Sequence, residues 1–422
     1  MTSEAPPATL KAIQARGYRS LRHVDLRFDG NFNVLVGPNG SGKSTLLDAV
    51  AFLSDYIQQG LERAVGRRTR NFQDLVWGRP TKSPGFELAF EFEVGDQELR
   101  YELSVEESGD GMRVVAENGY LRRLTPGEFA KSAAANSICK GVLAPGRRQR
   151  QIFGQKTDKN IVWFRPGKND RREIHFPRRL DDDWSAIGQL LVLRAFFPFR
   201  YKDEMDFSDV ETIADAVARR SVQCIQLDSR KLRQASRPNG DDGRRLADDG
   251  SNLPRVLEEL QSDPEEWGQW LDFVRLALPE IEDVRIVHRE DDRHAYMMVR
   301  RAGIEVPSWG VSEGTLRLFA LTVIAHLRKF PLAYLLEEPE NGIHPMAIEY
   351  VYQSLSTVSG AQVFIASHSP TLLRCVGIGQ VLCFGHDPQK GTVIVPGNEH
   401  PRLKDWQHSV DDTVFWAADI LS

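Results

Sequence analysis

The sequence has few cysteines and no long apolar run. Its 422 residues include 4 Cys, which form neither a C-x-x-C pair nor the dense spacing of a disulfide scaffold. The longest apolar stretches, residues 318–327 and 376–385, are far shorter than the ~20 residues that a membrane-spanning helix requires. The first residues are polar and lack the apolar core of a secretion signal. These absences favour a cytoplasmic protein that does not enter a membrane.

Sustained heptads and internal repeats are also missing, which excludes long coiled coils and solenoid architectures. Hydrophobic residues make up 41% of the chain and charged residues 27%, proportions that are typical of a folded globular protein. At ~100–200 residues per domain, the length predicts about two to four folding units.

The net charge of −5 is an average over two unlike regions. Between residues 140 and 179 there are 12 Lys and Arg against 3 acidic residues, and four aromatic residues lie among them. Basic side chains interleaved with aromatic rings are typical of surfaces that neutralise phosphates and stack on bases. The alternative is a solvated surface that contacts the acidic remainder of the chain. Four arginines are candidate contacts to DNA or RNA: Arg147, Arg148, Arg171 and Arg172.

Alternating strands and helices in both halves of the chain predict an α/β fold with a parallel sheet covered by helices. In the first part we expect strands over residues 10–14, 24–28, 32–36 and 86–93 and a helix over 43–57. Apolar and polar residues alternate over 86–93, which predicts a strand with one solvent-facing side and a partner strand that ends near residue 105. In the second part we expect helices over 254–260, 315–327 and 345–358 and strands over 285–287, 296–300, 332–336 and 363–366.

The periodic pattern weakens between these two parts. Residues 126–255 combine Pro and Gly breaks with helix-like pieces at 184–197 and 209–219. We expect an inserted, mainly helical and partly basic domain there. Residues 1–125 and 256–422 would then form lobe I and lobe II of one globular head.

A phosphate-binding loop follows the strand expected at residues 32–36. Gly37-Pro-Asn-Gly-Ser-Gly-Lys43-Ser44-Thr45 matches G-x-x-x-x-G-K-[ST] in full, and a predicted helix follows it. Glycines let backbone N–H groups surround phosphate oxygens, and the helix N-terminus adds its positive dipole end. Lys43 would reach the β- and γ-phosphates, and Ser44 would ligate Mg²⁺. The candidate ATP-binding residues are Gly37, Pro38, Asn39, Gly40, Ser41, Gly42, Lys43, Ser44 and Thr45.

Two acidic residues end a second apolar strand. Adjacent side chains on a strand face opposite sides, so Glu337 and Glu338 are expected to have different roles. Glu337 would hold the Mg²⁺ hydration shell, and Glu338 would orient or deprotonate the attacking water. His368 ends the next strand, where it would hydrogen-bond a γ-phosphate; a structural histidine is the alternative. Ser312 and Gly314 open a helix and form a further candidate anion site, for which an ordinary helix cap is the alternative.

This ordered set of motifs resembles the ABC-type ATPases of the branch that includes RecF, the SMC proteins and the OLD nucleases. The similarity is greatest to stand-alone OLD-type AAA family ATPases of bacterial defence systems. The residues that carry it are Gly17-Tyr18-Arg19-Ser20-Leu21, Asp249-Gly-Ser-Asn-Leu253, Ser312-Glu-Gly-Thr-Leu316, Glu337-Glu-Pro-Glu-Asn-Gly-Ile-His344-Pro345 and Ser367-His368-Ser-Pro370. It implies an ABC-type P-loop ATPase head, in which helices flank a mixed sheet and an antiparallel β subdomain is attached.

The resemblance also implies how two heads act together. Two copies would form a homodimer, or part of a higher oligomer, that sandwiches two ATP molecules. Ser312 and Gly314 of one head would face the P-loop of the other, and residues 341–344 would lie at the dimer seam. Tyr18 or Arg19 would contact the nucleotide; packing in the core or bracing the backbone is the alternative.

OLD nucleases carry a C-terminal nuclease domain, and the 54 residues after His368 are too few for one. We therefore expect an ATPase with a separate effector, a nuclease or toxin, that acts in antiphage defence. Asp411 and Asp412 resemble a metal pair but are more typical of a helix cap, and Gln73 is a candidate for the glutamine that links metal binding to conformational change. The alternative functions are a RecF-like repair or replication ATPase and a largely static ATP-bound scaffold that sequesters a toxin.

Overall fold

The computed structural model describes residues 8–80, 84–95, 97–109, 111–123, 150–156, 161–164, 174–177, 221–238, 243–401 and 403. The chain divides into two compact units, each built from separate stretches of sequence. The first unit comprises Met1–Asp29, Asn39–Val222 and Phe384–Ile394. The second comprises Gly30–Pro38, Gln223–Cys383 and Val395–Ser422. The chain therefore passes from one unit to the other inside the phosphate-binding loop.

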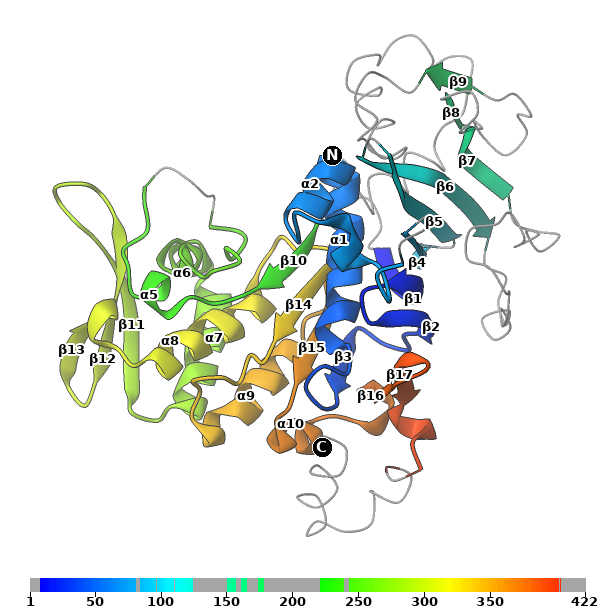
Figure 1. Cartoon of the computed structure of the whole chain (residues 1–422). Coiled ribbons are helices and arrows are strands. Elements are labelled where there is room, and N and C mark those ends of the chain that lie inside the picture. The colour runs from blue at the N-terminus through cyan, green and yellow to red at the C-terminus, as the bar shows by residue number, and fades with distance from the viewer. Residues whose placement is uncertain are drawn as a thin grey trace. The chain divides into compact units, whose positions relative to one another are not determined.

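An antiparallel sheet forms the body of the first unit (Figure 1), with the strand order β2-β1-β4-β5-β6-β7-β8-β9. Val94 of β4 pairs with Gln97 of β5, so a tight turn joins these strands. The strands are β1 (Ala8–Tyr18), β2 (Leu21–Arg27), β4 (Gly85–Val94), β5 (Gln97–Ser108), β6 (Gly111–Arg123), β7 (Arg150–Lys156), β8 (Ile161–Phe164) and β9 (Ile174–Pro177). The helices are α1 (Lys43–Gln59), α2 (Leu61–Gly66) and the 3₁₀ helix η1 (Phe72–Leu75).

The alternating pattern predicts that the polar side of β4 faces solvent, but part of that side is buried. Glu91 of β4 is buried, because Arg100 of β5 donates to it at 2.8 Å and Arg27 of β2 pairs with its other oxygen at 2.8 Å. Arg100 also donates to the buried Glu102 at 2.8 Å. Buried carboxylates are tolerated only when cations pair with them, and neighbouring strands supply those cations here.

The second unit contains parallel strands. The sheet has the order β10-β14-β15-β3-β16-β17, and β3 runs parallel to both β15 and β16, as β14 does to β15. Strands β3 and β15 are buried throughout, which is typical of the centre of a parallel sheet. The strands of this sheet are β3 (Phe32–Val36), β10 (Val222–Ile225), β14 (Ala333–Glu337), β15 (Gln362–Ser367), β16 (Val381–Asp387) and β17 (Gly391–Pro396). Residues 384–394, which include parts of β16 and β17, are assigned to the first unit.

A smaller antiparallel sheet in the same unit joins β11 (Ile281–His288), β12 (Ala295–Arg301) and β13 (Ile304–Pro307). The α-helices are α5 (Ser229–Leu232), α6 (Leu253–Gln261), α7 (Pro264–Ala277), α8 (Glu313–Thr322), α9 (Pro345–Ser356) and α10 (Pro370–Cys375). The 3₁₀ helices are η3 (Ser308–Gly310), η4 (Val323–His326), η5 (Ile378–Gln380) and η6 (Gly397–Glu399).

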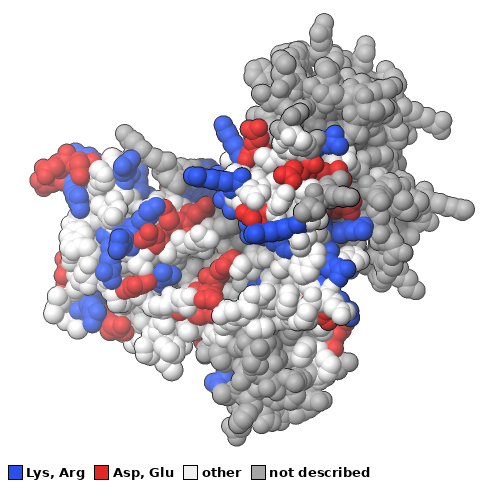
Figure 2. Space-filling view, viewed as in Figure 1, with Lys and Arg blue, Asp and Glu red and all other residues white. Residues whose placement is uncertain are grey.

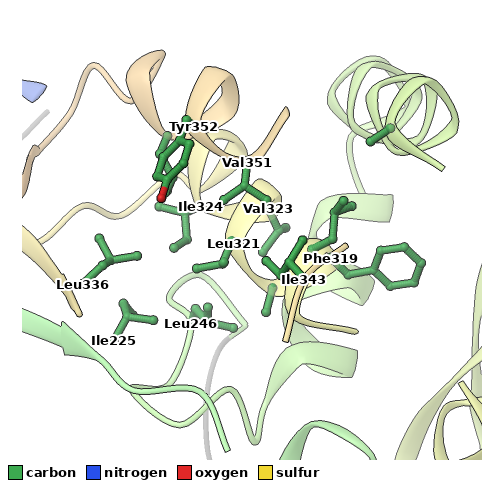
Figure 3. Close-up of a cluster of buried hydrophobic side chains, with 14 of the residues drawn as sticks. Ile225, Leu246, Phe319, Leu321, Val323, Ile324, Leu336, Ile343, Val351 and Tyr352 are labelled. Carbon is green, nitrogen blue, oxygen red and sulfur yellow. The ribbon is translucent and has the colours of Figure 1, made fainter. Parts of the chain in front are cut away.

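Helices α7, α8 and α9 lie beside β14 and β15 (Figure 1), and their apolar faces meet the sheet in a single core. Figure 3 shows Leu336 of β14 among side chains from α8, η4 and α9. The α-helix expected over 315–327 ends at Thr322 and continues as the tighter helix η4. The buried Thr322 hydroxyl donates to the Leu318 carbonyl at 2.8 Å and accepts from the Trp270 indole at 3.1 Å. A fully buried apolar side chain of this kind of core contributes about 1.5–3 kcal/mol.

The predicted fold class is confirmed: an α/β head with an attached antiparallel β subdomain. Strands β6 and β13 and helix α7 were not predicted. Between residues 126 and 220 the described residues form the strands β7, β8 and β9, and the mainly helical character of the insertion stays a prediction. The helix-like pieces at 184–197 and 209–219 lie outside the described residues. No helix in the described ranges is long and apolar enough to cross a membrane.

Candidate functional site

The carboxyl ends of three adjacent parallel strands carry the predicted catalytic motifs. Strand β3 leads into Gly37 of the phosphate-binding loop, β14 ends at Glu337, and β15 leads into His368. Strand β15 lies between the other two and pairs in parallel with both. Parallel strands bring their carboxyl ends to one edge of a sheet, which is where open α/β sheets bind ligands. Three motifs that are far apart in sequence therefore share one edge of the second unit.

Glu338 is held in an uncommon backbone conformation at this edge. Its φ is +44°, in the left-handed region that residues with a side chain rarely adopt. Its amide donates to the Ala366 carbonyl at 2.8 Å, and its carboxylate lies 3.5 Å from His368 Nε2. The side chain is 41% exposed, so water and a ligand can reach it. Strained backbone that the surrounding structure holds in place is typical of functional sites.

The oxygen donors predicted for a magnesium ion are Glu337 and Ser44. Glu337 is the exposed last residue of β14, and Ser44 lies in the first turn of α1. One carboxylate and one hydroxyl suit Mg²⁺, which takes few protein ligands and fills its shell with phosphate oxygens and water. Within the described ranges, no cluster of three or more His, Cys, Asp and Glu side chains would hold a metal ion alone. Each donor by itself is of the kind that Mg²⁺ accepts, and a joint site of Ser44 and Glu337, which belong to different units, stays a prediction.

Ser312 caps α8 at the helix-opening turn that the sequence predicts. Its Oγ accepts from the Thr315 amide at 3.2 Å. Glu313, in the first turn, accepts from the Ser229 hydroxyl and from Arg317 Nε, the latter at 2.8 Å. These two donors, Ser229 first, hold the pKa of the Glu313 carboxyl below its usual range. The turn is thus braced from α5 and from the next turn of its own helix.

Gly314 packs against the loop that follows β14. A Cβ added to Gly314 would lie 2.6 Å from the carbonyl oxygen of Gly342, so only glycine fits without a backbone shift. Gly342 itself has a φ of +79°, which also favours glycine. The helix-opening turn and the loop are therefore in direct backbone contact.

The phosphate-binding loop has the glycine geometry that its motif requires. Gly40 and Gly42 have φ values of +77° and +107°, and a Cβ added to Gly42 would lie 2.2 Å from Thr392 Oγ1. Ser41 is 1% exposed, and its hydroxyl has no hydrogen-bond partner among the described residues. Leaving a buried polar group unsatisfied is costly. An anion at the start of α1 would relieve that cost and meet the positive end of the helix dipole, so the loop fits a phosphate.

Lys43 begins α1 and is buried, and Asn39 at the tip of the loop is exposed. Gly37 and Pro38 close the segment of the loop that belongs to the second unit, and the residues from Asn39 onward belong to the first. Each half of the loop therefore carries part of the predicted phosphate site.

A pocket of about 700 Å³ opens beside Thr45, in the first turn of α1. Ser20, in the turn between β1 and β2, donates to Thr45 Oγ1 at 3.0 Å and accepts from Thr392 Oγ1 at 3.1 Å. These hydroxyls join the turn, the start of α1 and Thr392 of β17 beside the pocket. The side chains that give the pocket its chemistry come from Arg19, Asp74, Trp77 and Arg79.

The pocket combines cations with an aromatic wall. Arg79 pairs with Asp74 at 2.7 Å, and Arg19 pairs with Asp48 at 3.2 Å. Guanidinium groups suit phosphate and sugar oxygens, and an indole suits the face of a base. The composition of the pocket therefore suits the nucleoside end of a nucleotide.

Tyr18 does not line this pocket. It is 0% exposed, and its hydroxyl donates to Asp48 of α1 at 2.6 Å. Burial, and then the Asp48 charge, raise the pKa of Tyr18 well above its usual value. Arg68 also donates to Asp48, at 2.6 Å. Of the two predicted nucleotide contacts, Arg19 lines the pocket, whereas Tyr18 takes the alternative role of a core brace.

Some predicted residues lie outside the described part of the chain, namely Arg147, Arg148, Arg171, Arg172, Asp411 and Asp412. Nucleic-acid contact by the basic segment stays a prediction. Over the described part of the face in Figure 2, Lys and Arg side chains are interspersed with Asp and Glu. Gln73 is described, and its amide donates to Glu107 at 3.2 Å.

The sequence reasoning missed Asp48, Trp77 and Arg79. Asp48 had a signal, because it is an acid between the apolar pairs Leu46-Leu47 and Ala49-Val50 of the helix that follows the P-loop. Trp77 and Arg79 had none, because they lie in a loop without periodicity and become neighbours of Thr45 only through folding.

Comparison with protein families gives a match over most of the chain. The family described as "AAA domain, putative AbiEii toxin, Type IV TA system" matches residues 32–111 and 147–374, more than two thirds of the sequence. The family described as the P-loop containing region of AAA domain matches residues 9–54.

The curated relatives are similar over shorter stretches. The DNA replication and repair protein RecF of Pasteurella multocida is 35% identical over 96 residues, 23% of this chain and 26% of RecF. RecF of Allorhizobium ampelinum is 33% identical over 125 residues, 29% of this chain and 28% of RecF. The structural maintenance of chromosomes protein 1 of Caenorhabditis elegans is 33% identical over 78 residues, 18% of this chain and 6% of that protein. The chain thus spans about a quarter of the length of the RecF relatives that it matches.

Two solved structures share the fold over nearly the whole chain. The SMC head bound to the C-terminal winged-helix domain of ScpA has a TM-score of 0.52 and 13% identity, and the match covers 92% of this chain and 97% of that one. The Pyrococcus furiosus Smc head with an extended coiled coil, bound to the C-terminal domain of ScpA, has a TM-score of 0.50 and 13% identity, with coverage of 92% and 96%. At this identity the similarity shows a common fold alone.

Proposed function

The chain belongs to the AAA-domain family of the putative AbiEii toxin and is an ABC-type P-loop ATPase of the RecF/SMC-like kind, and we propose that it binds and hydrolyses ATP to drive a dimerisation switch. The observation that carries this proposal is the shared edge of β3, β14 and β15. There the start of the P-loop, the acidic pair and His368 follow three neighbouring parallel strands.

Each residue of the proposed site has one task. Lys43 and the loop N–H groups bind the β- and γ-phosphates, and Ser44 and Glu337 hold Mg²⁺. When bound, Mg²⁺ neutralises charge on the phosphates. Glu338 orients the attacking water and accepts its proton, which its exposure at the strand end allows. His368 hydrogen-bonds the γ-phosphate.

The nucleoside would occupy the pocket beside Thr45. Its aromatic wall at Trp77 would face the base, and Arg19 and Arg79 would face the sugar and the α-phosphate. This arrangement is supported by continuity, because Thr45, which lines the pocket, follows Lys43 and Ser44 in the first turn of α1.

We propose that the working form is a homodimer, or a higher oligomer built from head dimers. Ser312 and Gly314 of one head would meet the γ-phosphate bound by the other, and the capped N-terminus of α8 suits that anion. Residues 341–344 would lie at the seam. ATP would close the dimer, and hydrolysis would open it.

The biological role that we propose is antiphage defence of the OLD-like type, with a separate nuclease or toxin as effector. The family description, which names a putative toxin of a type IV toxin–antitoxin system, supports a role in such a module. The SMC head structures, each bound to a part of ScpA, support the idea that heads of this fold carry partner proteins. The basic segment at 140–179 would add contact with DNA or RNA.

The RecF relatives favour one alternative, a DNA repair or replication ATPase. A static scaffold that binds ATP and sequesters a toxin is the other alternative. Effector release with ATP and with a non-hydrolysable analogue separates the switch from the scaffold, because a static scaffold would respond alike to both. Proteins that copurify from the native operon separate defence from repair.

The proposed function is tested by ATP turnover and by size. Lys43→Ala should abolish ATP hydrolysis, whereas Lys11→Ala, in a half-buried ion pair with Glu93, should leave it unchanged. Glu338→Gln should bind ATP, hydrolyse it at least a hundredfold more slowly and accumulate dimers, since general-base catalysis is worth roughly 10²–10⁴-fold. Glu349→Gln, on the exposed side of α9, is its control. A Glu338→Gln protein that stays monomeric at saturating ATP would contradict the proposed dimer.

A further inference from the structure

The loop between β14 and α9, residues 338–344, is fastened to the end of β15. Glu340 accepts from the Ser367 hydroxyl and from Tyr352 Oη of α9, the latter at 2.9 Å. Ser367 is fully buried, so this anchor is shielded from water. Ile343, near the far end of the loop, lies in the apolar core (Figure 3). The loop is therefore held at two points rather than left free to move.

Asn341 connects this fixed loop to Glu338, the acidic residue at the start of the loop. Its Nδ2 donates to Glu338 Oε2 at 2.6 Å, and its amide donates to the Glu338 carbonyl at 3.0 Å. On the other side of Glu338, the amide donates to Ala366 and Oε1 faces His368. The uncommon φ of Glu338 and the direction of its carboxylate are thus fixed from both sides.

The same loop also contacts the turn that opens α8. The Gly342 carbonyl lies against Gly314, and a Cβ added to Gly342 would lie 3.2 Å from Glu313 Oε1. Glu313 is itself fixed by Ser229 and Arg317. Because these backbones have no room between them, a displacement of the α8 turn must displace Gly342 and hence its neighbour Asn341.

We infer that Asn341 is a positioning residue for Glu338 and that it couples the α8 turn to the hydrolytic acid of the same head. The inference rests on the proposed function. Asn341 orients the carboxylate and does not mask it, because the amide occupies only Oε2 and the Glu338 side chain stays 41% exposed. Nucleotide bound by a partner head at Ser312 and Gly314 would act on Glu338 through this loop.

Steady-state ATP turnover of Asn341 variants tests this role. Asn341→Ala should lower kcat about ten- to hundredfold, as loss of alignment of a catalytic group does, with the KM for ATP changed less than twofold. Asn341→Asp keeps the size of the side chain and its preference for turns but removes the amide donor, so its kcat should fall at least as far. Both variants should still form dimers with ATP, because each changes one side chain of the proposed seam and leaves every phosphate-binding group in place. Asn398→Ala, at an exposed asparagine of η6, is the matched control.

Two double variants test the route through Glu338. In the Glu338→Gln background, Asn341→Ala should cause no further loss, because a residue that acts through another has no effect once the other is gone. Gly314→Ala and Asn341→Ala should each lower kcat. In the double variant, the fold decrease in kcat should be smaller than the product of the two separate fold decreases. If the two fold decreases in kcat multiply, the α8 turn acts on hydrolysis independently of the loop, and the coupling is overturned.

The outcomes separate this inference from the function on which it rests. A wild-type protein that hydrolyses ATP no faster than Lys43→Ala overturns the proposed function and the inference with it. If the wild type turns over ATP while Asn341→Ala has unchanged or raised kcat, the inference alone is wrong. A loss in Asn341→Asp that falls on KM or on dimer formation, with kcat intact, overturns it as well.

Discussion

Tyr18 at the end of β1 and Asp48 in α1 are joined by a 2.6 Å hydrogen bond, although 30 positions separate them in the sequence. Asp48 also binds Arg68 at 2.6 Å and Arg19 at 3.2 Å. A single carboxylate thus connects a buried strand end, the helix that follows the P-loop and an arginine of the neighbouring pocket. The helix that follows the P-loop is therefore held to the end of β1 by a carboxylate outside the P-loop motif.

Tyr18→Phe should destabilise the protein without weakening ATP binding. The change removes a buried hydrogen bond to a charged group, which is worth about 1.5–3 kcal/mol, and leaves the ring packed. Denaturant unfolding should show that loss of free energy, and the dissociation constant for ATP should change less than twofold. Tyr350→Phe, on α9, is the control and should affect neither. Weakened ATP binding at unchanged stability would instead place the Tyr18 hydroxyl at the nucleotide.

Trp77→Ala should weaken the binding of ATP and ADP equally. Loss of a ring that faces a base is worth about 1–3 kcal/mol, so calorimetry should show roughly a tenfold or greater rise in both dissociation constants. Trp77→Phe should recover most of the affinity, and Trp309→Ala, at an exposed tryptophan of η3, should change nothing. If Trp77→Ala binds ADP as tightly as the wild type does, the nucleoside lies elsewhere.

Neutralising the basic segment should weaken binding to DNA or RNA. With Arg147, Arg148, Arg171 and Arg172 changed to Ala, the affinity should fall and depend less steeply on salt. On duplex DNA the log–log slope should shrink by about 0.9 for each phosphate that the variant no longer neutralises. Arg275, Arg285, Arg300 and Arg328 form exposed ion pairs in the second unit, and their joint replacement removes the same charge as a control. Equal affinity and slope in the first variant and in the wild type would favour the solvated-surface alternative.

The thiols of Cys375 and Cys383 should react slowly in the native protein. Burial raises the pKa of Cys375 to about 11 and that of Cys383 to about 12, against 9.0 for an ordinary thiol. Because the thiolate is the reactive form, iodoacetamide at pH 8 should label Cys375 roughly a hundredfold, and Cys383 roughly a thousandfold, more slowly than in the unfolded chain. Mass spectrometry of native and unfolded samples measures both rates.

The raised pKa values of Cys375 and Cys383 also determine how the stability of the folded protein changes with pH. Folding favours the protonated thiols, so their contribution to stability is complete below about pH 9 and is lost as the pH rises toward 11 and 12. Native labelling that is as fast as labelling of the unfolded chain would show that these thiols are open to solvent.

Local patterns were sufficient for the motifs and for the strands that carry them. The P-loop, the acidic pair and His368 each follow a short apolar run, and the predicted runs correspond to β3, β14 and β15. The alternation of strands and helices also predicted that these strands belong to a parallel sheet. That β15 lies between β14 and β3 comes from the structure. The fold class and the identities of the main candidate residues were therefore available before any coordinates.

Contacts between distant segments decided the rest. Glu91 has the spacing of a solvent-facing residue, and it is buried because arginines on two other strands neutralise it. Tyr18 belongs to a motif that suggests a nucleotide contact, and Asp48 draws it into the core instead. The left-handed backbone of Glu338 and its bond to Asn341 exist because β15, α9 and the α8 turn hold one loop in place. A sequence specifies which groups are present within a few residues of one another, whereas burial, charge pairing and backbone strain depend on neighbours that only the folded chain supplies.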